Sequence, residues 1–332
     1  MREKVITVRR ARMVKASADQ AWSLLASPAA LWSLRPSRFS FRADSPDEGL
    51  RLWVVLGIRP SGSFVHDVFE ITDEMPGRSL TLSRVSPASP GQELSLCFSA
   101  SPGARGTEIA LTVRQKISFL DVSTYEPWWQ VEAKAWLAAC AEAFAGRRPL
   151  ARDEPPPDVQ AACVTTLRPV RDMTQAITAS AATLVSAPPD RTWRLIYSPA
   201  SSLRVSPCAV AAGRVPGSPS NQAGEIQYLI NRADDGLLHL RWTFVDALDD
   251  GRTALGPPVG AVFTKTAGTL TKGGSARALM DFQVEPAERG SRLTVTLRVA
   301  PPATEEDRQA FEESLAMLLS GYKSFVEDAQ VP

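Results

Sequence analysis

The stretches VKASADQAWSLLASP (residues 14–28) and VSAPPDRTWRLIYSP (residues 185–199) are near copies of each other, 171 residues apart. Seven of their fifteen positions are identical, and these include the tryptophans Trp22 and Trp193. A repeat at so long a period indicates the duplication of a whole domain rather than a solenoid of short repeats. The chain is therefore predicted to hold two domains of the same fold.

Each stretch has the pattern of a strand end followed by a short helix. The alternating run ITVRRARMV ends at Val14 and predicts an edge strand, and SAATLV does the same before the second copy. Asp19 and Asp190 then fall at a helix start, where Asp caps or favours the first turn. The Ser-Pro pair that closes each stretch ends the helix, because the residue before a proline avoids helical geometry.

The first copy continues as short apolar runs separated by Gly, Pro, Ser and Asp. These runs predict strands over 51–58, 63–72, 79–85, 93–100 and 107–119. The last run alternates, with Ile109, Leu111 and Val113 on one face, which predicts an antiparallel sheet with its other face in water. Apolar residues three or four apart from Trp129 to Phe144 predict a long closing helix.

The second copy repeats this order of elements. Its clearest strands are predicted over 225–230, 237–245, 276–284 and 291–299, and its closing helix is predicted to start at Thr304. The Pro-rich, charged stretch RRPLARDEPPPDVQ between the copies is typical of a linker. We expect an α+β protein with one domain over 4–147, a linker over 148–175 and a second domain over 176–329.

Composition excludes several classes of protein. The formal net charge is +1, from 37 basic and 36 acidic residues, which argues against a nucleic-acid partner held by a basic field. No apolar stretch has the length of a membrane-spanning helix and the start lacks a signal-peptide pattern, so we expect a cytoplasmic protein. Four separated cysteines are typical of reduced thiols, and two histidines leave no zinc-ligand spacing. With no P-loop or GxGxxG motif, no cofactor is expected.

The order of strand, short helix, antiparallel strands and long C-terminal helix resembles the START/SRPBCC helix-grip superfamily. ASADQAWSLLASP and SAPPDRTWRLIYSP resemble the opening motif of that superfamily. FEITDEMPGRSLTLSRV followed by ARGTEIALTV resembles the strands of its polyketide-cyclase and heat-shock-ATPase-activator branches. The resemblance implies a curved sheet wrapped around the long helix, with a cavity for a lipid, polyketide or hormone between them. The tandem copies also resemble didomain aromatase/cyclases in architecture alone, so no catalytic residue is carried over.

Chemistry in such a cavity would come from polar side chains that point inward. Arg84 shares a strand face with Leu80, where its guanidinium would hold an enolate or carboxylate, or else reach water from the strand end. Gln115, the second catalytic candidate, lies among the apolar residues of its strand, where its side chain would point inward; the alternatives are a satisfied core amide or a bulge. His66 would act alone as general acid or base, because Asp67 points to the opposite face.

Aromatic side chains could stack on a flat ligand, with core packing as the alternative for each. Arg35 joins them, because in the superfamily this helix-to-strand segment often borders the cavity entrance. The predicted ligand-binding residues are Trp32, Arg35, Trp53, Trp129, Trp136 and Trp242. Trp242 is included because it shares an apolar face, taken as the inner one, with Leu238 and Leu240.

Three functions remain open at this point. The first is a cofactor-independent cyclase or aromatase that confines a polyketide-like intermediate and assists with one or two acids or bases. The second is a non-catalytic carrier or sensor of a hydrophobic ligand, and the third is a chaperone-associated interaction module. The first two take an apolar small molecule as partner, none requires a metal, and a homodimer is compatible with all three.

Overall fold

The chain divides between Ala162 and Cys163 into two units of the same architecture, which are described separately. The computed structural model describes the following residues: 3–47, 49–58, 64–85, 93–147, 154–167, 176–219, 224–233, 236, 238–245, 262–271, 274–299 and 303–329. Within this part of the chain, no helix has the length and apolar character needed to cross a bilayer.

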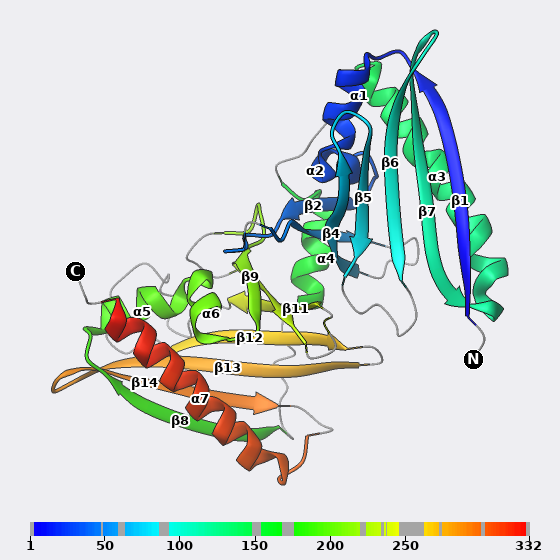
Figure 1. Cartoon of the computed structure of the whole chain (residues 1–332). Coiled ribbons are helices and arrows are strands. Elements are labelled where there is room, and N and C mark those ends of the chain that lie inside the picture. The colour runs from blue at the N-terminus through cyan, green and yellow to red at the C-terminus, as the bar shows by residue number, and fades with distance from the viewer. Residues whose placement is uncertain are drawn as a thin grey trace. The chain divides into compact units, whose positions relative to one another are not determined.

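Unit 1 is built on a seven-stranded antiparallel sheet in the order β1-β7-β6-β5-β4-β3-β2 (Figure 1). The strands are β1 (Glu3–Val14), β2 (Arg38–Arg42), β3 (Leu52–Ile58), β4 (Phe64–Met75), β5 (Ser79–Arg84), β6 (Leu94–Gly103) and β7 (Gly106–Ser118). All five strands predicted between residues 51 and 119 are present, and β1 lies at the edge of the sheet as expected.

Two short helices follow β1, and a long helix closes the unit. Helix α1 (Ala18–Leu25) begins with a capping box, in which Ser17 Oγ accepts from the Gln20 backbone N–H and Gln20 Oε1 accepts from the Ser17 N–H. Helix α2 (Pro28–Ser33) has its proline in the first turn. The one-turn η1 (Phe119–Asp121) leads into α3 (Val122–Phe144), the predicted long helix.

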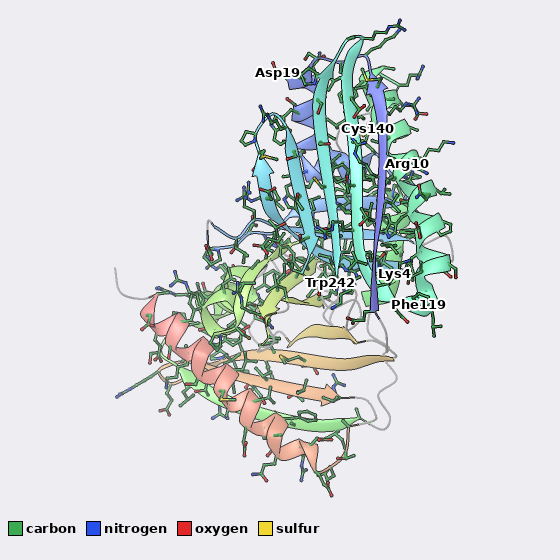
Figure 2. The ribbon with its side chains drawn as sticks, turned by 45° about the vertical axis from the view of Figure 1, so that its right-hand side comes forward. Lys4, Arg10, Asp19, Phe119, Cys140 and Trp242 are labelled. Atoms are coloured by element: carbon green, nitrogen blue, oxygen red, sulfur yellow. The ribbon has the colours of Figure 1, made fainter. Side chains whose placement is uncertain are left out.

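The core of unit 1 lies between α3 and one face of the sheet. The helix-facing side chains of β7, predicted from their alternation, pack with the inner stripe of α3, here Ala133 and Cys140. Figure 2 shows Cys140 on this helix beside the sheet. The expectation of one wet face does not extend to β3, where Val54, Val55 and Leu56 are all buried. A strand covered on both sides is apolar at successive positions.

One turn depends on glycine for a steric reason. Gly106 opens β7 with φ 135°, a conformation that side-chain-bearing residues rarely adopt. A Cβ added there would come within 2.2 Å of the Val14 carbonyl oxygen at the end of β1. The turn before the last strand therefore lies directly against the end of the first strand.

Unit 2 repeats this arrangement, with the strand order β8-β14-β13-β12-β11-β10-β9. The strands are β8 (Ile177–Val185), β9 (Ala209–Arg214), β10 (Ile226–Arg232), β11 (Leu238–Val245), β12 (Val262–Thr271), β13 (Gly274–Ala287) and β14 (Gly290–Val299). Its helices are α5 (Pro189–Tyr197), α6 (Pro199–Val205) and α7 (Asp307–Asp328). Each unit is thus a curved antiparallel sheet with a long C-terminal helix, the predicted helix-grip fold, and the fold occurs twice in tandem.

The stretch predicted as a linker contains a helix. Helix α4 (Pro157–Leu167) lies within 148–175, and the boundary between the two units falls inside it. Val159 is fully buried, and Ser37 Oγ donates to the Asp158 carboxylate of the same unit. The rest of the predicted linker, residues 148–153 and 168–175, lies outside the described residues.

Candidate functional site

The helix-facing side of the unit 1 sheet carries a transverse row of large and polar side chains. Trp53 on β3 pairs with Phe69 on β4, and Phe69 pairs with Arg84 on β5. The β5–β6 register continues the row to Leu94, which pairs with Gln115 on β7. Phe69 and Leu94 belong to the core beneath α3, so the whole row faces that helix.

Two predicted catalytic residues, Arg84 and Gln115, therefore lie on the same face of the sheet. They are two strands apart, which corresponds to about 10 Å between backbones. The Arg84 side chain is 10% exposed and lies 3.8 Å from the Asp67 carboxylate, measured from Nη1 to Oδ1. This distance is long for a hydrogen bond, so the contact is a loose ion pair.

Gln115 is held by a predicted ligand-binding residue. The indole Nε1 of Trp129 donates to Gln115 Oε1 at 2.6 Å, and both side chains are buried. The neighbouring Trp128 ring lies 4.4 Å from that of Trp129 and is 43% exposed. The amide of Gln115 is thus fixed with its oxygen on Trp129, as a satisfied core amide would be.

Two further predicted residues, Trp32 and Trp136, form an aromatic cluster above the row. The Trp32 ring lies 5.3 Å from Phe69 and 4.8 Å from Trp136, the latter in an edge-on arrangement. Trp136 stacks on Phe98 of β6 at 5.2 Å. All four rings are buried, so they join α2, α3 and the sheet into one apolar wall.

Arg35 reaches this cluster through a glutamate that the sequence analysis missed. Glu132 on α3 accepts from Arg35 Nε at 3.1 Å and Nη2 at 2.9 Å, a two-pronged ion pair with both side chains about one-fifth exposed. Glu132 Oε1 also accepts from Trp136 Nε1 at 3.2 Å. The spacing in the sequence could have indicated this residue. Glu132 lies three residues after Trp129 and four before Trp136, so the three side chains share one face of the helix.

His66 lies apart from the other two predicted catalytic residues. It is on β4 three positions before Phe69, so it points to the opposite face of the sheet from Phe69, Arg84 and Gln115. Burial lowers the pKa of His66 to about 4, so the imidazole is neutral at pH 7.

Trp242 also differs from its expected place. It pairs with Gly268 of β12, and Gly268 pairs with Arg277 of β13, whereas the core beneath α7 takes the side chains of Phe282 and Val284. By alternation Trp242 lies on the sheet face away from α7 (labelled in Figure 2), where it is 1% exposed. Alternation identified the residues that share a face; it could not show which face meets the helix.

Unit 2 contains a buried polar network that the sequence analysis did not find. The Glu225 carboxylate, fully inaccessible to solvent, accepts from Tyr197 Oη at 2.6 Å, Arg214 Nε at 2.7 Å and Gln227 Nε2 at 2.7 Å. Burial and the neighbouring carboxylate raise the pKa of Tyr197, so the phenol remains a donor. A buried carboxylate with three donors is fully satisfied, as a structural group would be.

The unit 1 site thus combines aromatic walls with fixed donors and paired charges. Among the described residues, no group of three potential ligands lies close enough to hold a metal ion. Burial raises the pKa of Cys140 to about 12, so that thiol stays protonated and is a poor nucleophile. A seven-stranded antiparallel sheet with a long C-terminal helix, present once in each unit, defines the class as a tandem helix-grip protein.

Comparison with known proteins gives likenesses to solved structures. No protein-family model and no curated protein matches the chain. The di-domain ARO/CYC BexL from the BE-7585A biosynthetic pathway is 14% identical, with 100% of this chain and 99% of that one covered and a TM-score of 0.34. The di-domain ARO/CYC StfQ from the steffimycin pathway is 10% identical over 97% and 99%, with a TM-score of 0.35. Ara h 8.0201 is 15% identical over 46% of this chain and 97% of that one, with a TM-score of 0.35.

Proposed function

We propose that unit 1 binds a flat, largely apolar, polyketide-like molecule between α3 and the sheet and promotes its cyclisation or aromatisation. The observation that carries this proposal is that Arg84 and Gln115 lie on the helix-facing side of the sheet together with three tryptophans. The tryptophans are Trp32, Trp129 and Trp136. Aromatic walls hold a flat substrate by stacking, and the polar groups among them orient it.

Confinement supplies the first part of the proposed mechanism. A flexible chain with several carbonyl groups reacts with itself in many ways, and a rigid apolar wall selects the fold in which two chosen carbons meet. The rings of Trp32, Phe69 and Trp136 are buried and in mutual contact, so this wall keeps its shape.

Electrostatic help supplies the second part. Removal of a proton from the carbon between two carbonyl groups leaves an enolate. The Arg84 guanidinium would stabilise the negative charge on the enolate oxygen. The Asp67 carboxylate, which lies 3.8 Å from Arg84 on the same face of the sheet, would take the proton. The enolate carbon then bonds to the second carbonyl carbon, whose oxygen takes the proton back from Asp67. This hydroxyl leaves as water with a proton of the neighbouring ring carbon, and enolisation of the remaining ring carbonyls gives the aromatic ring.

A carrier function is the second candidate, favoured by a specific feature of the charged groups. Arg84 pairs with Asp67 and Arg35 pairs with Glu132, while His66 lies on the other face of the sheet. Charged groups that are paired with each other are less available for acid–base chemistry on a ligand. Such a site would bind a ligand without converting it.

Native mass spectrometry of the protein from its producing cells separates these functions. We expect a co-purifying apolar molecule that is lost in Trp53→Asp and retained in the control Trp22→Phe, which alters a tryptophan of α1 outside the row. Incubation with a synthetic poly-β-ketone thioester should then give a product that has lost water, and Arg84→Gln and Asp67→Asn should each slow its formation. If the thioester is recovered chemically unchanged with the wild type and with every variant, the carrier function is supported. If no small molecule co-purifies with the protein, both functions are rejected.

A further inference from the structure

The indole nitrogen of Trp32 is a buried hydrogen-bond donor with no acceptor among the described residues. Trp32 as a whole is 7% exposed, and its ring is flanked by Phe69 and Trp136. Buried N–H groups in proteins are nearly always paired, so an unpaired one at a proposed binding site calls for a partner.

The two neighbouring tryptophans of the site show that pairing is the local pattern. Trp129 Nε1 donates to Gln115 and Trp136 Nε1 donates to Glu132. Helix α2 is tied to the sheet, because Ser40 of β2 donates to the Pro28 carbonyl at 3.2 Å. The Trp32 ring lies between this helix and the Phe69 ring.

We propose that Trp32 Nε1 donates to an oxygen of the bound molecule and thereby sets the ligand specificity of the site. This inference rests on the proposed function and adds the chemical class of the ligand: a flat conjugated molecule with a carbonyl or phenolate oxygen, rather than a plain hydrocarbon or lipid tail. The surroundings agree with an acceptor on the ligand. Arg84, paired in register with Phe69, presents a cation on the same face, whereas the carboxylates of Asp67 and Glu132 are engaged with arginines.

A matched pair of probes isolates this hydrogen bond. Acetylnaphthalene and ethylnaphthalene, substituted at the same ring carbon, have nearly the same shape, and the ketone oxygen is the acceptor that distinguishes them. Isothermal titration gives the ratio of their dissociation constants for the full chain, for Trp32→Phe, which keeps a ring and removes the N–H, and for the control Trp22→Phe. We expect the preference for the ketone to fall about tenfold in Trp32→Phe, the effect of one neutral hydrogen bond, and to stay unchanged in Trp22→Phe.

The outcomes distinguish this inference from the function on which it rests. Binding of both probes with the same ratio in the wild type and in Trp32→Phe would overturn the inference and leave the proposed function in place, the N–H then being satisfied by a neighbouring ring face. Binding of neither probe to the wild type would overturn both.

A second measurement applies if Trp32→Phe does not fold. In nitrogen-15 spectra of the wild type, the indole signal of Trp32 is assigned by its contact with the Phe69 ring protons. This signal should move downfield with the ketone and remain in place with the ethyl compound. Equal shifts with both probes would overturn the inference.

Discussion

Replacement of Tyr197 by phenylalanine tests whether the buried network of unit 2 stabilises the fold. Tyr197 Oη donates to the Glu225 carboxylate at 2.6 Å, and that carboxylate is fully buried. Phenylalanine fills nearly the same volume, so the change removes the hydrogen bond without leaving a large cavity. A hydrogen bond to a charged group contributes about 1.5–3 kcal/mol, so we expect unit 2 to lose about 2 kcal/mol of unfolding free energy.

Tyr322→Phe is the matched control in the same unit. Tyr322 is 3% exposed, and its ring packs edge-on against Phe282 at 5.9 Å. Its hydroxyl is not one of the three donors named above for the Glu225 carboxylate, so its removal should change the stability by less than about 0.5 kcal/mol.

Urea-dependent hydrogen exchange of the full chain provides the assay, because peptides from β9 and β10 report on unit 2 alone. We expect the urea midpoint of these peptides to fall in Tyr197→Phe, with an unchanged dependence on urea and an unchanged midpoint for unit 1. Equal midpoints for Tyr197→Phe and Tyr322→Phe would refute the reasoning, since the short contact with Glu225 would then add no net stability.

Three further predictions concern unit 1, with urea midpoints as the common measurement. Burial lowers the pKa of His66 from 6.5 to about 4, so the unfolded chain binds its proton first as pH falls. The His66 contribution to the unfolding free energy is therefore full above pH 6.5 and declines toward pH 4 by up to about 3 kcal/mol. His66→Phe should reduce this decline, and an equal dependence of the unfolding free energy on pH in the variant would contradict the prediction. Gly106→Ala should destabilise by more than about 1 kcal/mol, because the new Cβ meets a carbonyl, and by more than the control Gly77→Ala, whose Cβ meets nothing within 4 Å; the reverse order would count against the steric argument. Gln115→Leu should cost about 1–3 kcal/mol by leaving the Trp129 N–H without its acceptor, and an unchanged midpoint would mean that this donor finds another partner.

The sequence predicted the strands of unit 1 well because their limits depend on local signals. The alternation from Ile109 to Val113 and the Gly and Pro residues that separate the apolar runs act over a few positions, and the structure confirms the strands that they predict. The long helix over Val122–Phe144 was equally accessible, since its apolar stripe repeats over several turns. The duplication predicted a second unit of the same fold independently of the strand pattern within that unit.

The sheet face that meets the helix and the contacts between residues far apart in the sequence were harder to predict. Trp242 was placed on the wrong face, because a sheet covered on both sides has two apolar faces. Glu132 was passed over, because a charge on a helix is usually solvated and its partner Arg35 is almost a hundred residues away. Glu225 and Tyr197 likewise meet only through the pairing of β9 with β10 and the packing of α5. Such polar contacts between distant segments leave no periodic trace in a sequence.

The glycine turn of unit 1 has an exact counterpart in unit 2. Gly290 opens β14 with φ 104°, and a Cβ there would come within 2.1 Å of the Val185 carbonyl oxygen, as one at Gly106 would meet Val14. First strand and last hairpin are therefore joined by the same interlocking fit in both units. Because the contact is the same in both units, we expect chimaeras that exchange the last hairpin between the units to form complete seven-stranded sheets. The central strands could then be exchanged separately, which would transfer a binding surface from one unit to the other.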